Sequence, residues 1–446
     1  MLKVGFARVD ITPPLGVSVA GYFEKRFAKG VRDPLYATAV VFDDGIRRAV
    51  VMSVDVIGMN MEFMSVLRPA IAKKAGAETA GVFVACTHTH VGPTITNKDS
   101  TVGNFENAQY SEWLIGRLAD AALLAVSDLA EAISCKVTRG EAKGVSFIRR
   151  FRMKDGSART NPGWQNPDIA HPLSQADEES QLLIIKRKDA PEIGIVNFQV
   201  HPDVIGGEEL PPDYPKFVRD TYELNVPNSR CMYINGTQGD SNHVDVRLNP
   251  KEDCAVGYER ARYMGKKIAM SVISNYELAK EIQCDKISYA EKIISVKYNK
   301  GDPEEVPAAV ELAKRYYELG AEGALPLASI PGKSRSEILG RAVRIESLVS
   351  KPDNKELILT AVAIGNVVFA GFPGEPFTEV GIKVKQNSPF ALTIPACCAN
   401  GYEGYYPMQS AFDEKGYEAS TSRYVAGTAE KLIEASSEII KALKKL

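Results

Sequence analysis

The sequence predicts an α/β protein in which mixed β-sheets are flanked by helices. Short apolar runs typical of buried strands end abruptly in glycine, proline or polar residues, as at 82–86, 193–200 and 231–234. Longer segments carry apolar residues at helical spacing, most clearly at 110–129. Hydrophobic residues make up 45% and charged residues 25% of the chain, a balance typical of globular proteins. We expect one large domain spanning residues 1–446.

The first part of the chain is expected to be rich in strands. Residues 7–16 alternate in polarity and stop at Pro13-Pro14, as a short strand does before a loop. Residues 37–42 and 48–57 flank Asp43-Asp44-Gly45 and predict a hairpin. Asp55 lies inside the second apolar run, so it needs either a solvated face or a partner. Residues 146–172 mix basic residues with Gly, Pro and Asn and predict a long, irregular binding loop.

The second part of the chain is expected to combine helices with strands. Apolar spacing predicts helices over 258–278, 305–319, 334–348 and 424–446. Two apolar runs, 356–364 and 366–372, flank Gly365-Asn366 and predict a hairpin, and a further run covers 390–399. The segment around 300–350 is a candidate helical insertion, although no shift in composition marks a domain boundary there.

Composition argues against several classes of protein. The 54 basic and 56 acidic residues give a net charge of -2, which provides no electrostatic basis for binding nucleic acid. No apolar run has the roughly 18 residues needed for an integral membrane segment. The N-terminus lacks the apolar core of a signal peptide, and the seven cysteines show no CxxC spacing, so we expect reduced thiols and a cytoplasmic location. The expected partner is a small-molecule substrate, and a homo-oligomer stays open.

Polar residues follow several of the predicted strands. His88 and His90 follow the run at 82–86, His201 follows 193–200, Asp240 follows 231–234, and Glu375 follows 366–372. In a strand, side chains at i and i+2 share a face, so the first two histidines could address one point. If the strand exits lie at one edge of a sheet, all these groups could meet. Histidines with one carboxylate are the ligands of a catalytic zinc centre.

Motifs along almost the whole chain resemble those of the neutral/alkaline (non-lysosomal) ceramidase family. They are Arg8-Val9-Asp10-Ile11-Thr12-Pro13, Thr87-His88-Thr89-His90-Val91-Gly92-Pro93, His201-Pro202, Asn235-Gly236 through Gly239-Asp240, Phe372-Pro373-Gly374-Glu375-Pro376-Phe377-Thr378, Asn400-Gly401-Tyr402-Glu403-Gly404-Tyr405 and Gly416-Tyr417-Glu418-Ala419-Ser420-Thr421. The resemblance implies the N-terminal catalytic domain of that family, in a divergent bacterial-type member.

The resemblance also implies roles for individual residues. It places Zn²⁺ on four ligands: His88, His201, Glu375 and Tyr405. It places His90 beside the metal-bound water, and Arg149 with it for proton transfer and handling of the leaving group. It makes Tyr417 the group that stabilises the oxyanion, and it makes Asp240 and Asn242 catalytic residues of the active-site loop.

Three departures from the family bear on the substrate. We expect neither the signal peptide nor the C-terminal immunoglobulin-like domain of the secreted ceramidases. Asn242 stands where the family loop has its active-site serine, and Asp203 follows His201-Pro202 where ceramidases have small polar residues. The polar, arginine-bearing segment that begins at Arg149 also suits a sphingolipid poorly. These departures favour a substrate smaller or more polar than ceramide.

Three functions remain open at the level of sequence. The first is a zinc-dependent hydrolase that cleaves an amide (N-acyl) bond with metal-activated water. The second is a zinc-dependent lactonase or esterase for a sugar-acid-like substrate attracted by Arg149 and Arg152. The third is a non-catalytic binding protein that retains the metal site.

Overall fold

A nine-stranded mixed sheet forms the centre of the molecule in the computed structural model, which describes residues 1–95, 104–249, 255–330 and 334–445. Its strand order is β16-β14-β13-β8-β1-β5-β6-β7, and β18 also pairs with β8. The pairs β6–β7 and β14–β16 are parallel, and the other pairs are antiparallel. The strands are β1 (Lys3–Asp10), β5 (Tyr36–Asp43), β6 (Arg48–Val54), β7 (Val82–Cys86), β8 (Ala130–Glu141), β13 (Glu179–Arg187), β14 (Ala190–Phe198), β16 (Ser229–Asn235) and β18 (Lys280–Ile282).

A second sheet packs face to face on the first. It has the order β19-β20-β21-β23 and consists of β19 (Ile287–Lys297), β20 (Asn354–Ile364), β21 (Val367–Gly371) and β23 (Leu392–Ala396). Alternate residues of a strand point to opposite faces. In β5, Val40 and Phe42 accordingly join the core shared with Phe369, whereas Ala39 and Val41 join the core beneath the helices on the other face.

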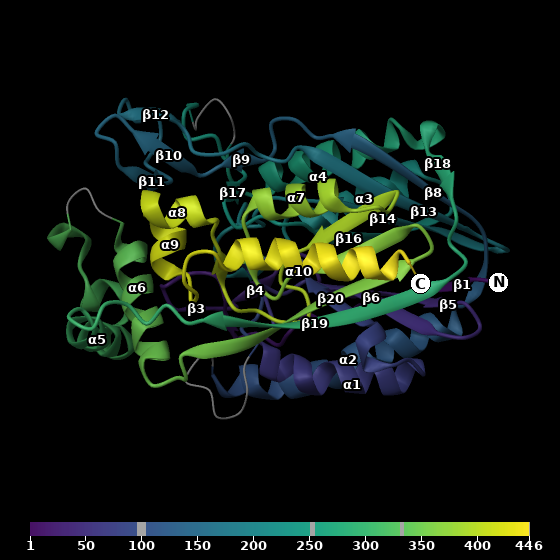
Figure 1. Ribbon diagram of the computed structural model, residues 1–446, viewed down its shortest axis with the longest axis horizontal. Coiled ribbons are helices and arrows are strands. Elements are labelled where there is room, and N and C mark those ends of the chain that lie inside the picture. The colour runs from purple at the N-terminus through teal and green to yellow at the C-terminus, as the bar shows by residue number, and fades with distance from the viewer. Residues whose placement is uncertain (96–103, 250–254, 331–333, 446) are drawn as a thin grey trace.

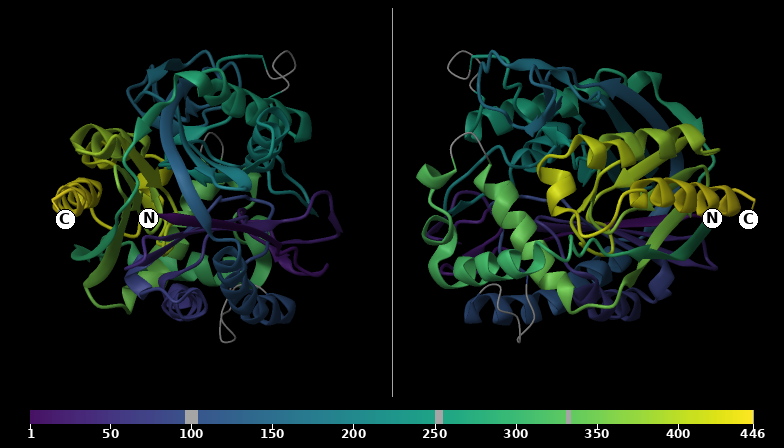
Figure 2. Two further views of the ribbon diagram at one scale, coloured as in Figure 1. Left: turned by 90° about the vertical axis from the view of Figure 1, so that its right-hand side faces the viewer. Right: turned by 60° about the vertical axis from the view of Figure 1, so that its left-hand side comes forward.

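Helices cover the outer faces of both sheets (Figure 1). The core of α1 (Met61–Ala75) and α2 (Phe105–Ser127) is shared with β5–β7, and that of α3 (Tyr214–Asn225) and α4 (Tyr258–Ile273) with β13, β14 and β16. The second sheet is covered by α7 (Thr378–Asn387) and α10 (Thr428–Leu443). In the left view of Figure 2, these yellow C-terminal helices lie on one flank, apart from the blue and purple helices α1 and α2.

The large sheet curls until its two ends meet. Ser53 of β6 donates from Oγ to the carbonyl oxygen of Tyr233 in β16 at 2.6 Å. Asn235, at the end of β16, donates from Nδ2 to the carbonyl oxygen of Thr87 at 3.2 Å. The second sheet joins at the same place, where the Cys397 amide donates to the Asn235 carbonyl at 3.1 Å. The predicted strand exits therefore meet, but they come from both ends of one sheet and from a second sheet. The expectation of a single sheet edge was wrong.

The hairpins predicted around Gly45 and Gly365 are confirmed. The predicted helices are also present, with shifted ends; one of them stops at Ile273, and the last begins only at Thr428. The helices α5 (Val306–Ala324) and α6 (Arg335–Val349) lie between β19 and β20, at the segment considered as an insertion. Whether this segment is an insertion in a single domain stays a prediction.

The segment 146–172 is more regular than predicted. It contains β9 (Phe147–Ile148), followed by a three-stranded antiparallel sheet of β10 (Arg150–Met153), β11 (Ala158–Thr160) and β12 (Ile169–Pro172). Phe151 and Met153 of β10 are buried in a small core with Val244 and Val246, and this core packs segment 146–172 against the rest of the protein.

Two of the sequence expectations concern the cysteines and the apolar character of the helices. Cys86, Cys135, Cys231, Cys397 and Cys398 are buried free thiols, Cys284 is a half-buried one, and Cys254 lies outside the described residues. Among the helices in the described parts of the chain, none has the length and apolar character to cross a membrane.

Candidate metal centre

His88 stands on a sharp turn immediately after β7. The amides of Thr87 and His88 bond to the carbonyl oxygens of Val54 and Val56, which carries the chain alongside the end of β6. His88 then takes the left-handed conformation (φ 71°), which is uncommon for a residue other than glycine. Its Nδ1 lies 2.7 Å from the carbonyl oxygen of Ile57, so Nε2 faces away from β6.

His201 and Glu375 lie just after the ends of two other strands, β14 and β21. His201 follows β14, and its Nδ1 lies 3.1 Å from the carbonyl oxygen of Gln238. Glu375 belongs to β22 (Glu375–Pro376), which pairs in parallel with β24 (Tyr405–Tyr406), so that Glu375 and Tyr405 are register partners. The loop after β16 packs directly on this strand, because a Cβ on Gly239 would lie 2.4 Å from the Glu375 carbonyl oxygen. Only glycine fits at that position.

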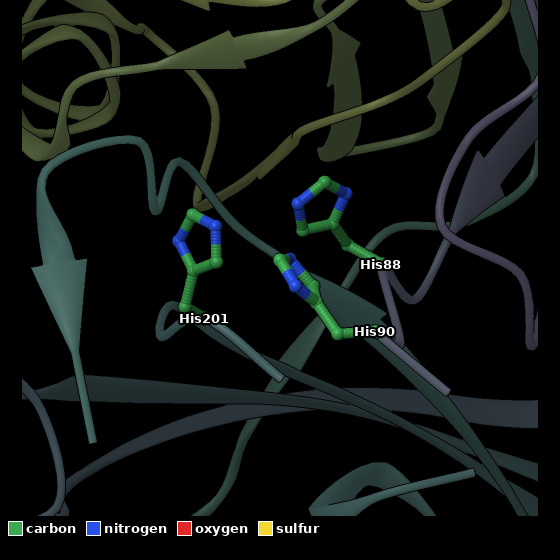
Figure 3. Close-up of side chains that lie close together, drawn as sticks. All are labelled: His88, His90 and His201. Carbon is green, nitrogen blue, oxygen red and sulfur yellow. The ribbon is translucent and has the colours of Figure 1, made fainter. Parts of the chain in front are cut away.

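The side chains of these segments converge on one buried point. One nitrogen each of His88, His90 and His201 lies within 4.8 Å of the others (Figure 3). Oε2 of Glu375 lies 3.3 Å from Nε2 of His88 and 3.3 Å from Nε2 of His201. Both ring nitrogens of His90, and Nε2 of His201, nevertheless have no hydrogen-bond partner. Buried polar atoms left without partners in this way suit a cluster that could hold a metal ion.

The electrostatics keep two of these imidazoles neutral. Burial, followed by the neighbouring His88, lowers the pKa of His90 well below 6.5. Burial, followed by Arg149, lowers the pKa of His201 to about 4. Burial works to raise the pKa of Glu375, but His88 and His201 outweigh it, so the net pKa lies well below 4.5. Neutral imidazoles beside an ionised carboxylate are the protonation states that metal ligands need.

Arg149, Tyr405 and Tyr417 form a second group next to Glu375. Nε of Arg149 donates to Oε1 of Glu418 at 2.7 Å, and Nη2 donates to the Gly239 carbonyl at 2.9 Å. Its guanidinium carbon lies 5.3 Å from the centre of the Tyr405 ring, and the Tyr405 and Tyr417 rings meet edge to face with centroids 5.7 Å apart. Burial raises the pKa of Tyr417 to about 12, so its hydroxyl keeps its proton at neutral pH.

The structure places Asp240 and Asn242 in supporting contacts. Oδ1 of Asp240 accepts hydrogen bonds from the amide (2.7 Å) and hydroxyl (2.8 Å) of Thr378, and Oδ2 accepts from Ser174 at 3.0 Å. Asn242 donates to Asn161 and accepts from the His243 amide. These contacts use both oxygens of Asp240. They are structural, and the catalytic role expected for Asp240 stays a prediction.

Sequence reasoning gave no role at the centre to three of its neighbours. Oδ1 of Asp203 lies 3.6 Å from Nδ1 of His90, and the same oxygen accepts a hydrogen bond from the Tyr22 hydroxyl. His243 is buried, and neither of its ring nitrogens has a hydrogen-bond partner. Apart from the rarity of histidine, no local pattern marks these positions.

Two solved structures share the overall fold. One is described as neutral ceramidase from Pseudomonas aeruginosa; it matches with a TM-score of 0.71 and 16% identity over 99% of this chain and 75% of that chain. The other is described as ceramidase complexed with C2; it matches with a TM-score of 0.70 and 16% identity over 100% of this chain and 75% of that chain. No family model matches the sequence. The resemblance predicted from the motifs is therefore confirmed for the fold.

Proposed function

We propose that the protein is a zinc-dependent hydrolase that cleaves an amide (N-acyl) bond in a substrate smaller or more polar than ceramide. The observation that carries the proposal is the buried convergence of His88, His90, His201 and Glu375, in which both ring nitrogens of His90 and Nε2 of His201 have no hydrogen-bond partner. The likeness of fold to two ceramidase structures supports hydrolysis as the reaction class. The proposed ligands are His88, His201, Glu375 and Tyr405. His90 lies close enough to be a further ligand.

The residues around this point could divide the work of acyl transfer. A bound zinc ion supplies a Lewis acid and lowers the pKa of a coordinated water to about 7. His90, neutral at pH 7, can accept the proton of the attacking water and return it to the leaving nitrogen. Tyr417, still protonated, can donate a hydrogen bond to the developing oxyanion. Burial and Glu375 raise the pKa of Tyr405 well above 10, and the positive charge of Arg149, which Glu418 holds beside this ring, opposes that shift.

The surroundings of the centre support a polar substrate. Tyr22 is 41% exposed, and Asp203 has a side-chain exposure of 29%, whereas His88 and Glu375 are only 1% exposed. The groups that lie toward solvent on the Asp203 side of the buried centre are therefore polar. The argument for a sugar acid is weaker, because Arg149 is paired with Glu418, and Arg152 lies 3.4 Å from Glu414.

Metal analysis of the purified protein tests the site. We expect about one zinc per chain in the wild type and its loss in His88→Ala and Glu375→Ala. His171→Ala is the matched control, because His171 is exposed on β12, away from the centre, and should leave the zinc content unchanged. Zinc retained at wild-type stoichiometry in both ligand variants would overturn the proposed site.

Substrate profiling tests the reaction. A panel of short N-acyl amides, long-chain ceramide and lactones should show turnover of short amides, lost on chelation and restored by zinc. Hydrolysis of lactones with no amide turned over would favour the lactonase. Intact zinc with no turnover of any acyl substrate would favour a binding protein.

A further inference from the structure

The segment that follows β2 (Ser18–Val19) contacts the imidazole of His90 on the side of the ring that carries Nδ1. Gly21 has φ 109°, and a Cβ there would lie 2.8 Å from Nδ1 of His90. Arg26 donates from Nη2 to the carbonyl oxygens of His90 and Ala20 and from Nη1 to that of Gly207. The ring is thus held with Nδ1 toward this segment, which leaves Nε2 as the nitrogen that faces the other histidines.

All three histidines of the centre have Nδ1 facing an acceptor outside it. For His88 the acceptor is the Ile57 carbonyl at 2.7 Å, and for His201 it is the Gln238 carbonyl at 3.1 Å. For His90 the acceptor facing Nδ1 is the carboxylate of Asp203, with Oδ1 at 3.6 Å. This separation exceeds a hydrogen bond and is a close electrostatic contact.

Tyr22 fixes the carboxylate opposite His90. Its hydroxyl donates to the same Oδ1 of Asp203, and its ring meets the His90 ring edge to face with centroids 5.8 Å apart. The guanidinium carbon of Arg26 lies 4.0 Å from the centre of the Tyr22 ring. Burial and the neighbouring Asp203 raise the pKa of Tyr22 above its ordinary value, so the hydroxyl stays a donor.

We propose that Asp203 is a positioning residue that accepts the Nδ1 proton of His90 and so fixes the neutral tautomer whose Nε2 lone pair points at the centre. An imidazole that works through one nitrogen is commonly oriented by a carboxylate or carbonyl on the other. With Nε2 unprotonated, His90 can accept a proton or bind metal; with the opposite tautomer, it can do neither. Tyr22 orients the carboxylate.

Asp203→Ala is the informative substitution. The oxygen that faces His90, Oδ1, is also the one that accepts from Tyr22, so an asparagine would still present an acceptor to His90, whereas alanine removes it. The loss of the acceptor should let the proton move to Nε2. Glu208→Gln is the matched control: Glu208 lies on the same loop and pairs with Lys29 at the surface.

The tautomer can be measured without turnover. With ¹⁵N-labelled histidine, the ring nitrogens can be read through the carbon-bound ring protons, and the chain has only five histidines. The His90→Gln spectrum identifies the His90 signals. We expect Nδ1 to be protonated in the wild type and in Glu208→Gln, and a much larger share of molecules to be protonated at Nε2 in Asp203→Ala. Protonation at Nε2 in the wild type, or an unchanged tautomer in Asp203→Ala, would overturn the proposal.

The kinetic consequence rests on the proposed hydrolase function. Loss of an orienting partner typically costs about 10–100-fold. We expect Asp203→Ala to lower kcat by about this factor with KM little changed, Tyr22→Phe to lower it less, and Glu208→Gln to leave it unchanged. An unchanged kcat in folded Asp203→Ala would remove Asp203 from this role. If no substrate is turned over, the proposed function fails, but the tautomer measurement still decides the role of Asp203.

Discussion

His243 is a buried ionisable residue near the centre. Its imidazole is 5% exposed, and neither ring nitrogen has a hydrogen-bond partner. Burial is the main reason that its pKa falls from 6.5 to about 4, and the positive charge of Arg260 acts in the same direction. The negative charge of Asp203 opposes the shift but does not cancel it. His243 is therefore neutral over the pH range in which an unfolded histidine becomes charged.

The difference in the pKa of His243 between the unfolded and the folded chain predicts that the protein loses stability at acidic pH. Between pH 6.5 and 4 the unfolded chain binds a proton at His243 that the folded protein does not, so the stability from this group is present above pH 6.5 and falls toward pH 4. The shift corresponds to about 3 kcal/mol. Denaturant unfolding at a series of pH values should show a shallower decline in His243→Gln under the same zinc conditions. Parallel pH profiles for the two proteins would contradict the assignment.

The pairing of His88 with His90 was predicted for an incomplete reason. Alternation along a strand suggested a shared face, but β7 ends at Cys86 and His88 has φ 71°, so the turn brings the two rings together. Their ring centroids lie 5.1 Å apart. The sequence identified the residue types that meet at the centre. Asp203 was noted only as a departure from the family, and His243 was given no role, because the contacts of both residues come from neighbours distant in the chain.

At the scale of elements, α7 depends on a residue outside itself. The residue before the helix, Phe377, has no side-chain oxygen to cap it. Asp240 supplies the missing acceptor by taking hydrogen bonds from the amide and hydroxyl of Thr378. A carboxylate at a helix N-terminus also interacts favourably with the helix dipole. The loop after β16 thereby fixes the start of α7, just beyond Glu375.

We therefore expect Asp240→Ala to act on stability before chemistry. Loss of the helix cap and of the contact with Ser174 should cost about 2 kcal/mol in the free energy of unfolding. Thr378→Val removes only the hydroxyl donor and should cost about 1 kcal/mol. Urea unfolding measures both. If Asp240→Ala kept wild-type stability but lost activity, the result would support the catalytic role expected for Asp240 from the sequence.

Elements with a clear apolar period were predictable, and half-buried ones were not. The helix α2 and the hairpin of β5 and β6 carry strong patterns, and both are present. The strand β8 has mostly half-exposed residues, with no run of buried positions longer than two, so its sequence gives little signal. The small sheet of β10 to β12 is stabilised by distant partners such as Val244, which a local pattern cannot reveal.

At the scale of the whole molecule, one buried ion pair helps close the curled sheet. Asp55 follows β6 and is 0% exposed; its oxygens accept hydrogen bonds from Nη1 and Nη2 of Arg219 at 2.9 and 2.8 Å. Arg219 belongs to α3, which packs on β16 at the opposite end of the strand order. The partner expected for Asp55 from its apolar surroundings is thus a cation on a distant helix.

Breaking this pair should be far more damaging than breaking a surface pair. We expect Asp55→Ala to cost about 3–5 kcal/mol, because it leaves the Arg219 charge buried and uncompensated. The double variant Asp55→Ala/Arg219→Met should be more stable than Asp55→Ala alone. Glu379→Ala, which breaks an exposed pair with Lys383, should cost less than about 1 kcal/mol. Equal costs for Asp55→Ala and Glu379→Ala in denaturant unfolding would contradict this account.

The residues of the centre lie far apart in the sequence, so the ribosome synthesises them at different times. A nascent chain that has emerged as far as His201 holds two of the proposed ligands, but the carboxylate of Glu375 and its strand partner Tyr405 are still to be made. The strand β16, which closes the sheet next to Thr87, also comes after His201. If the proposed ligands bind zinc, its acquisition would be a late event in biosynthesis, and a chain that stalls before Glu375 would lack the full ligand set.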